Sequence, residues 1–225
     1  MTLTNARKRI ACERCRRPQN ACICRWIRPT THAVEVVLLQ HPLEEHSAKG
    51  SARLLHLSLP RSRMVVGETF AEREVHALLH DPFEPGAFTQ HIAKHTILLY
   101  PQTTDDTAAP PPLLPEMLHD PSRLRLIVLD GTWRKSRKLL HLNPLLRTLP
   151  RLSLNEVPQS RYLIRKAHRA NQLSTLEATC FALAQIEGDA ERFDPLLRAF
   201  DGFVAQQMGY RPDITGGRRP ETRFD

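Results

Sequence analysis

Four cysteines near the N-terminus are spaced as ligands of one metal ion. Two residues separate Cys12 from Cys15, six separate Cys15 from Cys22, and one separates Cys22 from Cys24. A pair two residues apart is the usual knuckle geometry for tetrahedral zinc, because the turn between them aims both sulfurs at one point. Four thiolates would fill the coordination sphere, so the cluster predicts a structural Zn²⁺ ion and not a catalytic one. A redox-active thiol pair and an iron–sulfur cluster are the alternatives.

A second group of candidate residues follows the apolar run 126–129. Asp130, Gly131, Thr132 and Trp133 precede a basic helical pattern there. Ligands of open α/β sheets bind at the carboxyl ends of strands, so Asp130 is a candidate catalytic acid. The same residue would equally serve as the N-cap of the next helix. Trp133 would be either a core residue or a platform for a stacked ring.

A third motif, residues 173–178, marks the start of an apolar helix. Ser174 and Glu177 have the spacing of a capping box, in which each side chain hydrogen-bonds the backbone amide of the other residue. Capping alone would explain both residue types. The amides at such a helix start would also bind a ligand carboxylate or phosphate. Cys180, inside the apolar helix, is expected to be a small core residue.

Positive charge is concentrated in the segment that carries the four cysteines. The chain has a formal net charge of +8, and residues 7–28 hold eight cations but a single acid, Glu13. Arginines dominate among these cations, and a guanidinium suits bidentate phosphate contact. A nucleic acid is therefore the expected partner, with a solvated charge run as the alternative.

Strand and helix patterns alternate after residue 28, which predicts an α/β fold with a mostly parallel sheet covered by helices. Short β-branched and apolar runs predict strands at 34–39, 63–67, 96–100, 124–129 and 151–154. Helical periodicity predicts helices at 47–57, 71–80, 134–140, 175–186 and 190–208. The proline-rich stretch 102–115 predicts a surface loop. We expect three segments: a basic zinc-binding segment at 1–28, a catalytic domain at 29–208 and a basic flexible tail at 209–225.

The location of the protein and its partners are constrained by what the sequence lacks. No apolar run reaches the roughly 18 residues that span a bilayer, and the first residues lack the apolar core of a secretory signal. We therefore expect a cytoplasmic protein with reduced thiols, no membrane contact and no obligate protein partner. Neither a Gly-x-Gly-x-x-Gly turn nor a P-loop motif is present, which disfavours the common dinucleotide and nucleoside-triphosphate folds.

The ordered combination of these motifs resembles the DTW-domain family over nearly the whole chain. The matching residues are the N-terminal cysteines, His41 to Glu44, Tyr100 and Pro101 after a strand, Asp130 to Trp133, and the run 173–177. The family is related to the SPOUT class. The resemblance therefore implies a SPOUT-like sheet with a trefoil-knotted C-terminal part, flanked by helices, with the cysteine knuckle added at the N-terminus.

The resemblance also implies an activity, since the family members are tRNA-uridine aminocarboxypropyltransferases. They are expected to transfer a 3-amino-3-carboxypropyl group from S-adenosylmethionine to N3 of a uridine in tRNA and to release methylthioadenosine. Asp130 would be the catalytic residue and the base for the N3 proton. The donor would contact Leu99, Tyr100, Pro101, Leu129, Thr132, Trp133, Leu173, Ser174 and Thr175. The tRNA would contact Arg14, Arg16, Arg17, Arg25, Arg134, Lys135, Arg161 and Arg165.

Two other functions remain open. The sulfonium of the donor activates three carbons, and positioning alone selects which of them is attacked, so a SPOUT-type RNA methyltransferase is one alternative. A zinc-dependent RNA-binding module without activity, in which Asp130 is only a cap, is the other. Residues 49–54 depart from the Asn-Thr-containing version expected in the family, so no site residue is assigned there.

Overall fold

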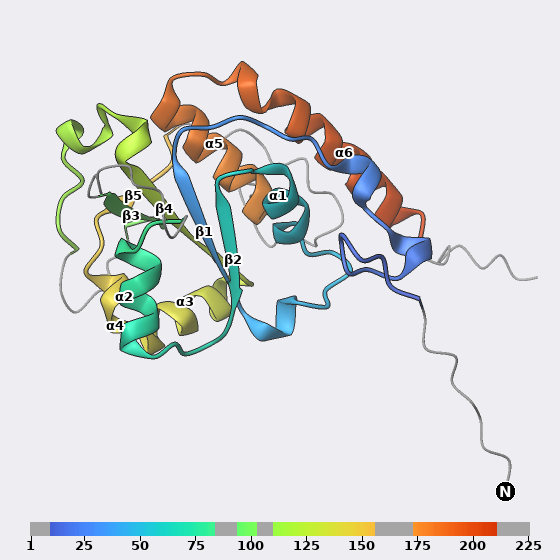
Figure 1. Ribbon diagram of the computed structural model, residues 1–225, viewed down its shortest axis with the longest axis horizontal. Coiled ribbons are helices and arrows are strands. Elements are labelled where there is room, and N and C mark those ends of the chain that lie inside the picture. Colours follow the sequence, from blue (N-terminus) through green and yellow to red (C-terminus); the bar gives the residue numbers. More distant parts are fainter. Residues whose placement is uncertain (1–9, 84–93, 103–109, 156–172, 211–225) are drawn as a thin grey trace, which may run out of the picture.

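The computed structural model describes residues 10–83, 94–102, 110–155 and 173–210. These residues contain one five-stranded sheet in the order β2-β1-β4-β3-β5 (Figure 1). All neighbouring strands in it are parallel. The strands are β1 (Glu35–Gln40), β2 (Ser62–Val66), β3 (His95–Leu99), β4 (Leu124–Asp130) and β5 (Arg151–Leu152). The predicted α/β class with a mostly parallel sheet is confirmed.

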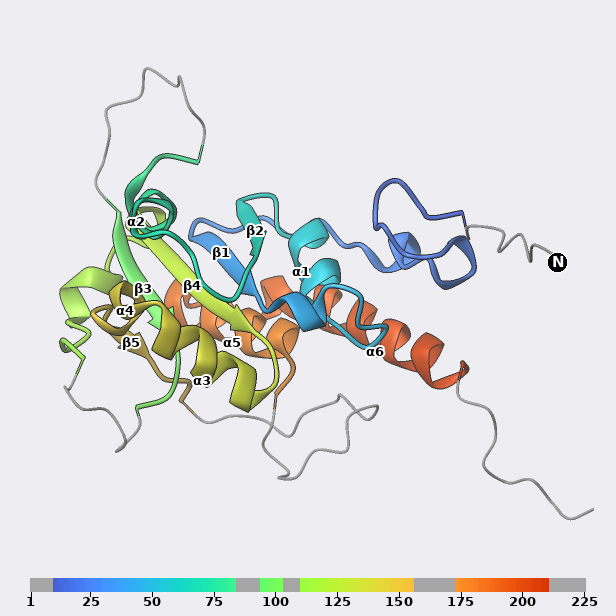
Figure 2. The ribbon, with the colours of Figure 1, turned by 90° about the horizontal axis from the view of Figure 1, so that it is seen from below.

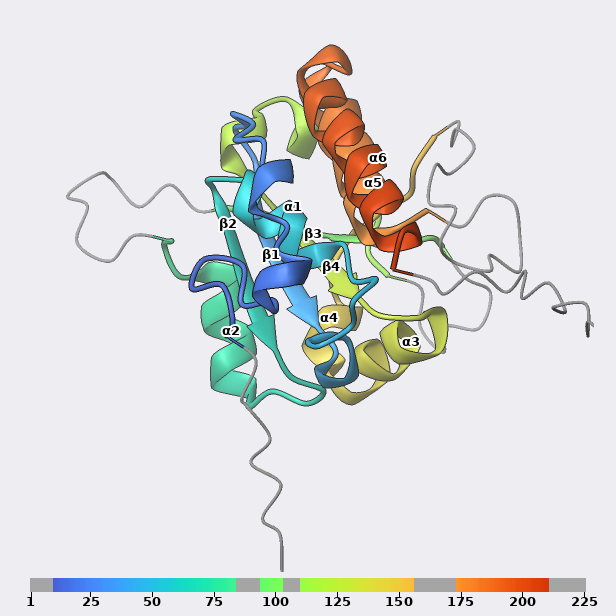
Figure 3. The ribbon, with the colours of Figure 1, turned by 90° about the vertical axis from the view of Figure 1, so that its right-hand side faces the viewer.

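Helices cover both faces of the sheet (Figure 3). One face packs against α1 (Ala52–Ser58), α5 (Thr175–Glu187) and α6 (Asp194–Met208). The other packs against α2 (Glu72–His80), α3 (Trp133–Leu142) and α4 (Pro144–Arg147). Every residue of β1 and β4 is buried. The sequences of these central strands are therefore mostly apolar, as those of parallel strands covered on both faces are.

The observed elements differ from the predicted ones in several places, and the predicted helix 190–208 is a short 3-10 helix, Glu191–Phe193, followed by α6. The helix predicted from residue 47 begins at Ala52, and residues 47–51 form turns instead. The strand predicted at 151–154 has only two residues, and the short helix α4 was not predicted. The Pro at the start of α4 fixes a helical φ angle, but four residues are too few for a periodic pattern.

A buried ion pair lies at the end of the sheet where the parallel strands begin. Glu35, the first residue of β1, accepts hydrogen bonds at Oε2 from Nε and Nη2 of Arg125, at 3.0 and 2.7 Å. Arg125 is fully buried and also donates to the backbone carbonyls of Leu78 and Asp81. Lys94 lies 3.5 Å from Glu35. This carboxylate is thus neutralised by cations of the chain itself.

The cysteine segment packs against α6, the last helix described (Figure 2). Ile23 and Ile27 are buried in the same apolar cluster as Phe203 of α6. The indole Nε1 of Trp26 donates to Gln206, whose amide donates to the carbonyl of Cys22. At Gly202 of α6, an added Cβ would lie only 2.2 Å from the Trp26 ring. The segment is therefore fastened to the α/β layers by both apolar and polar contacts.

The described residues include no helix that is long and apolar enough to cross a membrane. The predicted flexible tail falls mostly on residues 211–225, which lie outside the described residues, as do 103–109 of the predicted loop. The predicted trefoil knot involves the C-terminal part of the chain, where residues 156–172 are also outside, so it stays a prediction.

Candidate functional site

Asp130 is the last residue of β4 and is 5% exposed. The parallel register places it beside Gln40, the last residue of β1. Its Oδ2 accepts a 2.7 Å hydrogen bond from Gln40 Nε2, and its Oδ1 accepts a 2.6 Å hydrogen bond from Thr175 Oγ1. The N-cap of α3 is instead Thr132, which accepts a hydrogen bond from the amide of Lys135. Asp130 is thus not the helix cap that spacing alone had allowed.

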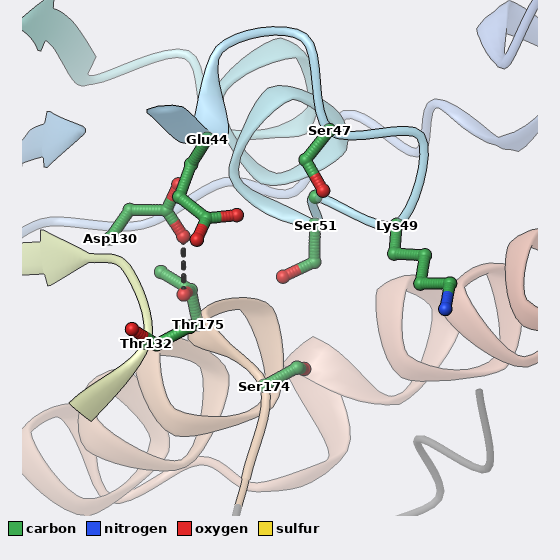
Figure 4. Close-up of a pocket in the computed structure, with 9 residues that line it drawn as sticks. Glu44, Ser47, Lys49, Ser51, Asp130, Thr132, Ser174 and Thr175 are labelled. Carbon is green, nitrogen blue, oxygen red and sulfur yellow. Dashed lines mark hydrogen bonds between the residues drawn. The ribbon is translucent and has the colours of Figure 1, made fainter. Parts of the chain in front are cut away.

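A pocket with about 550 Å³ of empty space, including its open mouth, lies above this strand end (Figure 4). Three separate parts of the chain form its wall: the loop after β1, the β4 to α3 turn and the start of α5. The residues that line it are Glu44, Ser47, Lys49, Gly50, Ser51, Asp130, Thr132, Ser174 and Thr175. Its lining is polar and carries both signs of charge. Such a pocket suits a zwitterionic or charged small molecule better than an apolar one.

Glu44 is the second carboxylate of the pocket. It is 9% exposed, and its Oε1 accepts a 2.8 Å hydrogen bond from Lys135 Nζ of α3. Figure 4 shows its carboxylate on the same side of the pocket as that of Asp130. His41 holds the turn that carries Glu44, because its Nδ1 accepts from the amide of Leu43 and its Nε2 donates to Glu68 at 2.6 Å. Lys138 and His41 together lower the pKa of Glu68.

The start of α5 forms the opposite wall. The predicted capping box is confirmed: Ser174 Oγ accepts from the amide of Glu177, and the Glu177 carboxylate accepts from the amide of Ser174. The amide of Leu176 donates to Ser51 Oγ, which ties this wall to the loop after β1. Because the helix dipole favours negative charge at its N-terminus, this wall suits an anionic ligand group.

An aromatic stack lies at the β4 to α3 turn. Trp133, the first residue of α3, is 49% exposed and stacks on the buried Tyr100, with ring centroids 5.1 Å apart and an interplanar angle of 14°. The guanidinium of Arg151 lies 5.2 Å from the Tyr100 centroid. The half-exposed indole is thus held from one side, so a planar ligand group would find a fixed partner for stacking.

The predicted donor-binding residues divide into two groups. Thr132, Ser174 and Thr175 line the pocket together with Asp130. The other six do not line the pocket. Tyr100 and Trp133 form the aromatic stack, and the remaining four are sequence neighbours of the stack or of the pocket residues: Leu99, Pro101, Leu129 and Leu173. Their donor contacts stay a prediction.

The predicted RNA-binding residues are not equivalent. Those that are exposed are Arg14, Arg16, Arg25 and Arg134. Lys135 pairs with Glu44 inside the site. Arg17 is half-buried, donates to backbone carbonyls of the loop after β1, and lies over the Phe203 ring. Arg161 and Arg165 lie outside the described residues. RNA contact stays a prediction for each of these residues.

The four N-terminal cysteines form one cluster. Their sulfur atoms all lie within 4.8 Å of one another, with 3.6 Å between Cys12 and Cys24 and 3.8 Å between Cys15 and Cys22. A tetrahedral Zn²⁺ with Zn–S bonds of about 2.3 Å would place its sulfurs about 3.8 Å apart. Hydrogen bonds from the backbone of Cys15 and Arg14 lower the pKa of the Cys12 thiol to about 6, while burial raises the pKa of Cys24 to about 12. The residues present fit a tetrahedral metal ion. Cys180 is fully buried in α5, as expected of a core residue.

Several pocket residues were not found from the sequence. Glu44, Ser47, Lys49, Gly50 and Ser51 all follow β1. The sequence contained a signal for these pocket residues, because a polar turn with serine and glycine follows the apolar run of β1. Carboxyl ends of adjacent parallel strands meet at one edge, so this turn should have been placed beside Asp130.

Comparison with known proteins agrees with the resemblance seen in the sequence. The model of the DTW domain matches residues 9–208. The chain is 32% identical over 205 residues to tRNA-uridine aminocarboxypropyltransferase 2 of Drosophila melanogaster, covering 89% of this chain and 76% of that protein. It is 29% identical over 222 residues to tRNA-uridine aminocarboxypropyltransferase 2 of Mus musculus, covering 95% of this chain and 69% of that protein. No solved structure matches the chain. The predicted relationship is confirmed: the chain belongs to the DTW-domain family.

Proposed function

We propose that this protein modifies tRNA by transferring the 3-amino-3-carboxypropyl group of S-adenosylmethionine to N3 of a uridine, with release of methylthioadenosine. The single observation that carries this proposal is the position of Asp130. It ends β4 in a polar pocket, in contact with the capped start of α5, in a chain whose relatives are named tRNA-uridine aminocarboxypropyltransferases. The SPOUT-type methyltransferase remains the competing reaction.

The charges of the pocket match the amino-acid part of the donor. That part carries an ammonium and a carboxylate. Glu44 would attract the ammonium, while Lys49 and the start of α5 would attract the carboxylate. Trp133, held by Tyr100, would stack on the adenine or on the target base, with a contribution on the order of 1 to 3 kcal/mol. The donor contacts of Leu99, Tyr100, Pro101, Leu129 and Leu173 belong to the same proposal.

Asp130 would act on the tRNA. The donor supplies an electrophilic γ-methylene, activated by its sulfonium. Uridine N3 carries a proton that must leave, and Asp130 would accept it while N3 forms a bond to the γ carbon. The bond between that carbon and sulfur breaks, and its electron pair stays on the neutral thioether of methylthioadenosine. Gln40 and Thr175 each hold one oxygen of Asp130, so the carboxylate has a fixed orientation toward the pocket.

The cysteine segment would bind the tRNA backbone. Arg14, Arg16 and Arg25 are exposed there, and a Zn²⁺ ion held by the four thiolates would fix the turns that carry them. Phosphate contacts of this kind weaken steeply with salt. Arg134, Arg161 and Arg165 would add contacts near the site. We also retain the trefoil knot, the three predicted segments and the cytoplasmic location as parts of this proposal.

A product assay tests the proposal. The purified protein is incubated with S-adenosylmethionine and unmodified tRNA, and the small-molecule product is identified by mass spectrometry. We expect methylthioadenosine, together with a matching gain in mass on uridine. S-adenosylhomocysteine would instead establish the methyltransferase. No product from a protein that still binds tRNA would favour the inactive RNA-binding module.

A further inference from the structure

Arg17 connects the cysteine segment to the pocket wall. Its Nη1 donates to the carbonyl of Ala48 at 2.7 Å, and its Nη2 donates to the carbonyls of Gly50 at 2.9 Å and Ser47 at 3.5 Å. One guanidinium therefore holds the loop 47–50, which lies 30 to 33 positions further along the chain. Ser47, Lys49 and Gly50 of this loop line the pocket.

The backbone of Arg17 is fixed by the cysteine cluster. The amide of Cys12 donates to the carbonyl of Arg17, and the amide of Arg16 donates to the carbonyl of Cys12, both at 2.7 Å. Arg16 has a φ of 57°, in the left-handed region that closes this turn. A metal ion bound by Cys12 and Cys15 would hold the same turn. The position of the guanidinium thus depends on the geometry of the cluster.

The loop that Arg17 holds also has hydrogen bonds along its own backbone. The amide of Ser47 donates to Glu44 and the amide of Gly50 donates to Ser47, so each bond is local. Ser51 Oγ, next in sequence, accepts from the amide of Leu176 in the opposite wall. Release of Arg17 would therefore free three carbonyls and let one wall of the pocket move.

We propose that Arg17 is a positioning residue that transmits metal binding at the cysteine cluster to the pocket. Arg17 is also a predicted RNA contact, and its guanidinium donates to the backbone of the loop 47–50. The inference rests on the proposed function only in naming the pocket ligand as S-adenosylmethionine. Coupling between two sites is reciprocal, so the donor must tighten metal binding by the same factor by which the metal tightens donor binding.

The first experiment measures that coupling. Zinc affinity is determined by chelator competition, with and without S-adenosylmethionine, for the wild type, Arg17→Lys and Arg14→Ala. Lysine keeps the charge but lacks the planar fork that reaches several carbonyls. Arg14→Ala removes an exposed arginine of the same segment and is the matched control. We expect the donor to tighten zinc binding about tenfold in the wild type and in Arg14→Ala, but less than twofold in Arg17→Lys. Equal coupling in all three proteins would overturn the proposal.

A second experiment needs no donor. Hydrogen exchange of the peptide that contains residues 44–51 is compared in the same zinc-loaded proteins, and in the wild type after zinc removal. Arg17→Lys and zinc removal should both speed exchange at the amides of Ser47 and Gly50, while Arg14→Ala should not. Unchanged exchange in zinc-loaded Arg17→Lys overturns the positioning role, even if zinc removal unfolds the chain. Failure of the wild type to bind S-adenosylmethionine would instead count against the proposed function, and this exchange result would still decide the role of Arg17.

Discussion

Two buried carboxylates lie at opposite ends of neighbouring inner strands of the sheet, Glu35 at the start of β1 and Asp130 at the end of β4. They are 4% and 5% exposed, so burial does not distinguish them. Glu35 is neutralised by Arg125, with Arg61 and Lys94 nearby, and does not line the pocket that contains Asp130. Asp130 accepts hydrogen bonds from Gln40 and Thr175 and lines the pocket. The open space in front of the group indicates function, whereas burial alone does not.

The largest effect is expected for Asp130→Asn. An amide cannot accept the N3 proton, so kcat should fall by about 10²- to 10⁴-fold. The fold should survive, because the Thr175 hydroxyl can accept a hydrogen bond from the new amide while Gln40 still donates to its oxygen. Single-turnover kinetics with tRNA and a urea titration measure the two quantities. Activity within twofold of wild type would remove Asp130 from the chemistry and erase the contrast with Glu35.

Glu35→Gln should lower stability and leave kcat unchanged, the opposite of Asp130→Asn. It leaves the fully buried Arg125 without its anionic partner, which should cost about 3 to 5 kcal/mol of the free energy of unfolding. Molecules that remain folded should keep their kcat, because the change lies at the far end of the sheet. Chemical denaturation and assays at low temperature test both statements. A stable variant with low kcat would show that the start of β1 communicates with the site.

Ser174→Ala tests the wall at the start of α5. Loss of the capping hydroxyl should lower the free energy of unfolding by about 1 kcal/mol. Ser174→Asp is the matched variant, since aspartate also caps but adds negative charge to the pocket. It should keep stability and weaken binding of the donor carboxylate. Equal donor affinity in both variants would place the ligand carboxylate elsewhere.

The smallest effect concerns how the free energy of unfolding depends on pH through His32, which lies just before β1. Burial lowers the pKa of His32, whose Nδ1 donates to the carbonyl of Val34 while its Nε2 accepts from the amide of Arg61. The unfolded chain therefore takes up a proton first as the pH falls through about 6.5, and stability declines below that value. The slope from this residue should not exceed about 1.4 kcal/mol per pH unit. Urea titrations from pH 7.5 to 5.5 should show a shallower slope for His32→Gln. An unchanged slope would assign the pH dependence to another group.

Most of the sheet could be predicted from the sequence, because strands buried on both faces leave nearly continuous apolar runs. β1 and β4 were predicted to within one residue at each end. The motif that ends β4 and the capping box of α5 are local patterns, and both were recognised. The cysteine cluster was also recognisable, since all four ligands lie within thirteen residues.

What could not be predicted depends on contacts between distant residues. The pairing of Gln40 with Asp130 follows from the register of two strands that lie ninety positions apart. Residues 47–51 were expected to be helical, yet the loop 47–50 is held in turns by Arg17, thirty positions or more away. Charge composition favoured RNA contact for Arg14, Arg16, Arg17 and Arg25, and only the fold shows that Arg17 also binds the loop 47–50.

The contact between Trp26 and Gln206 has a consequence for the order of synthesis. The two residues are 180 positions apart, so the cysteine segment is synthesised long before α6, the helix against which it packs. At about 5 to 20 residues per second, the ribosome needs roughly 10 to 40 s to make the intervening chain. Throughout that time Ile23 and Ile27 lack the apolar surface of α6 that covers them in the finished protein. A nascent chain stalled before α6 should therefore expose these residues to chaperones, even with its cysteines already bound to metal.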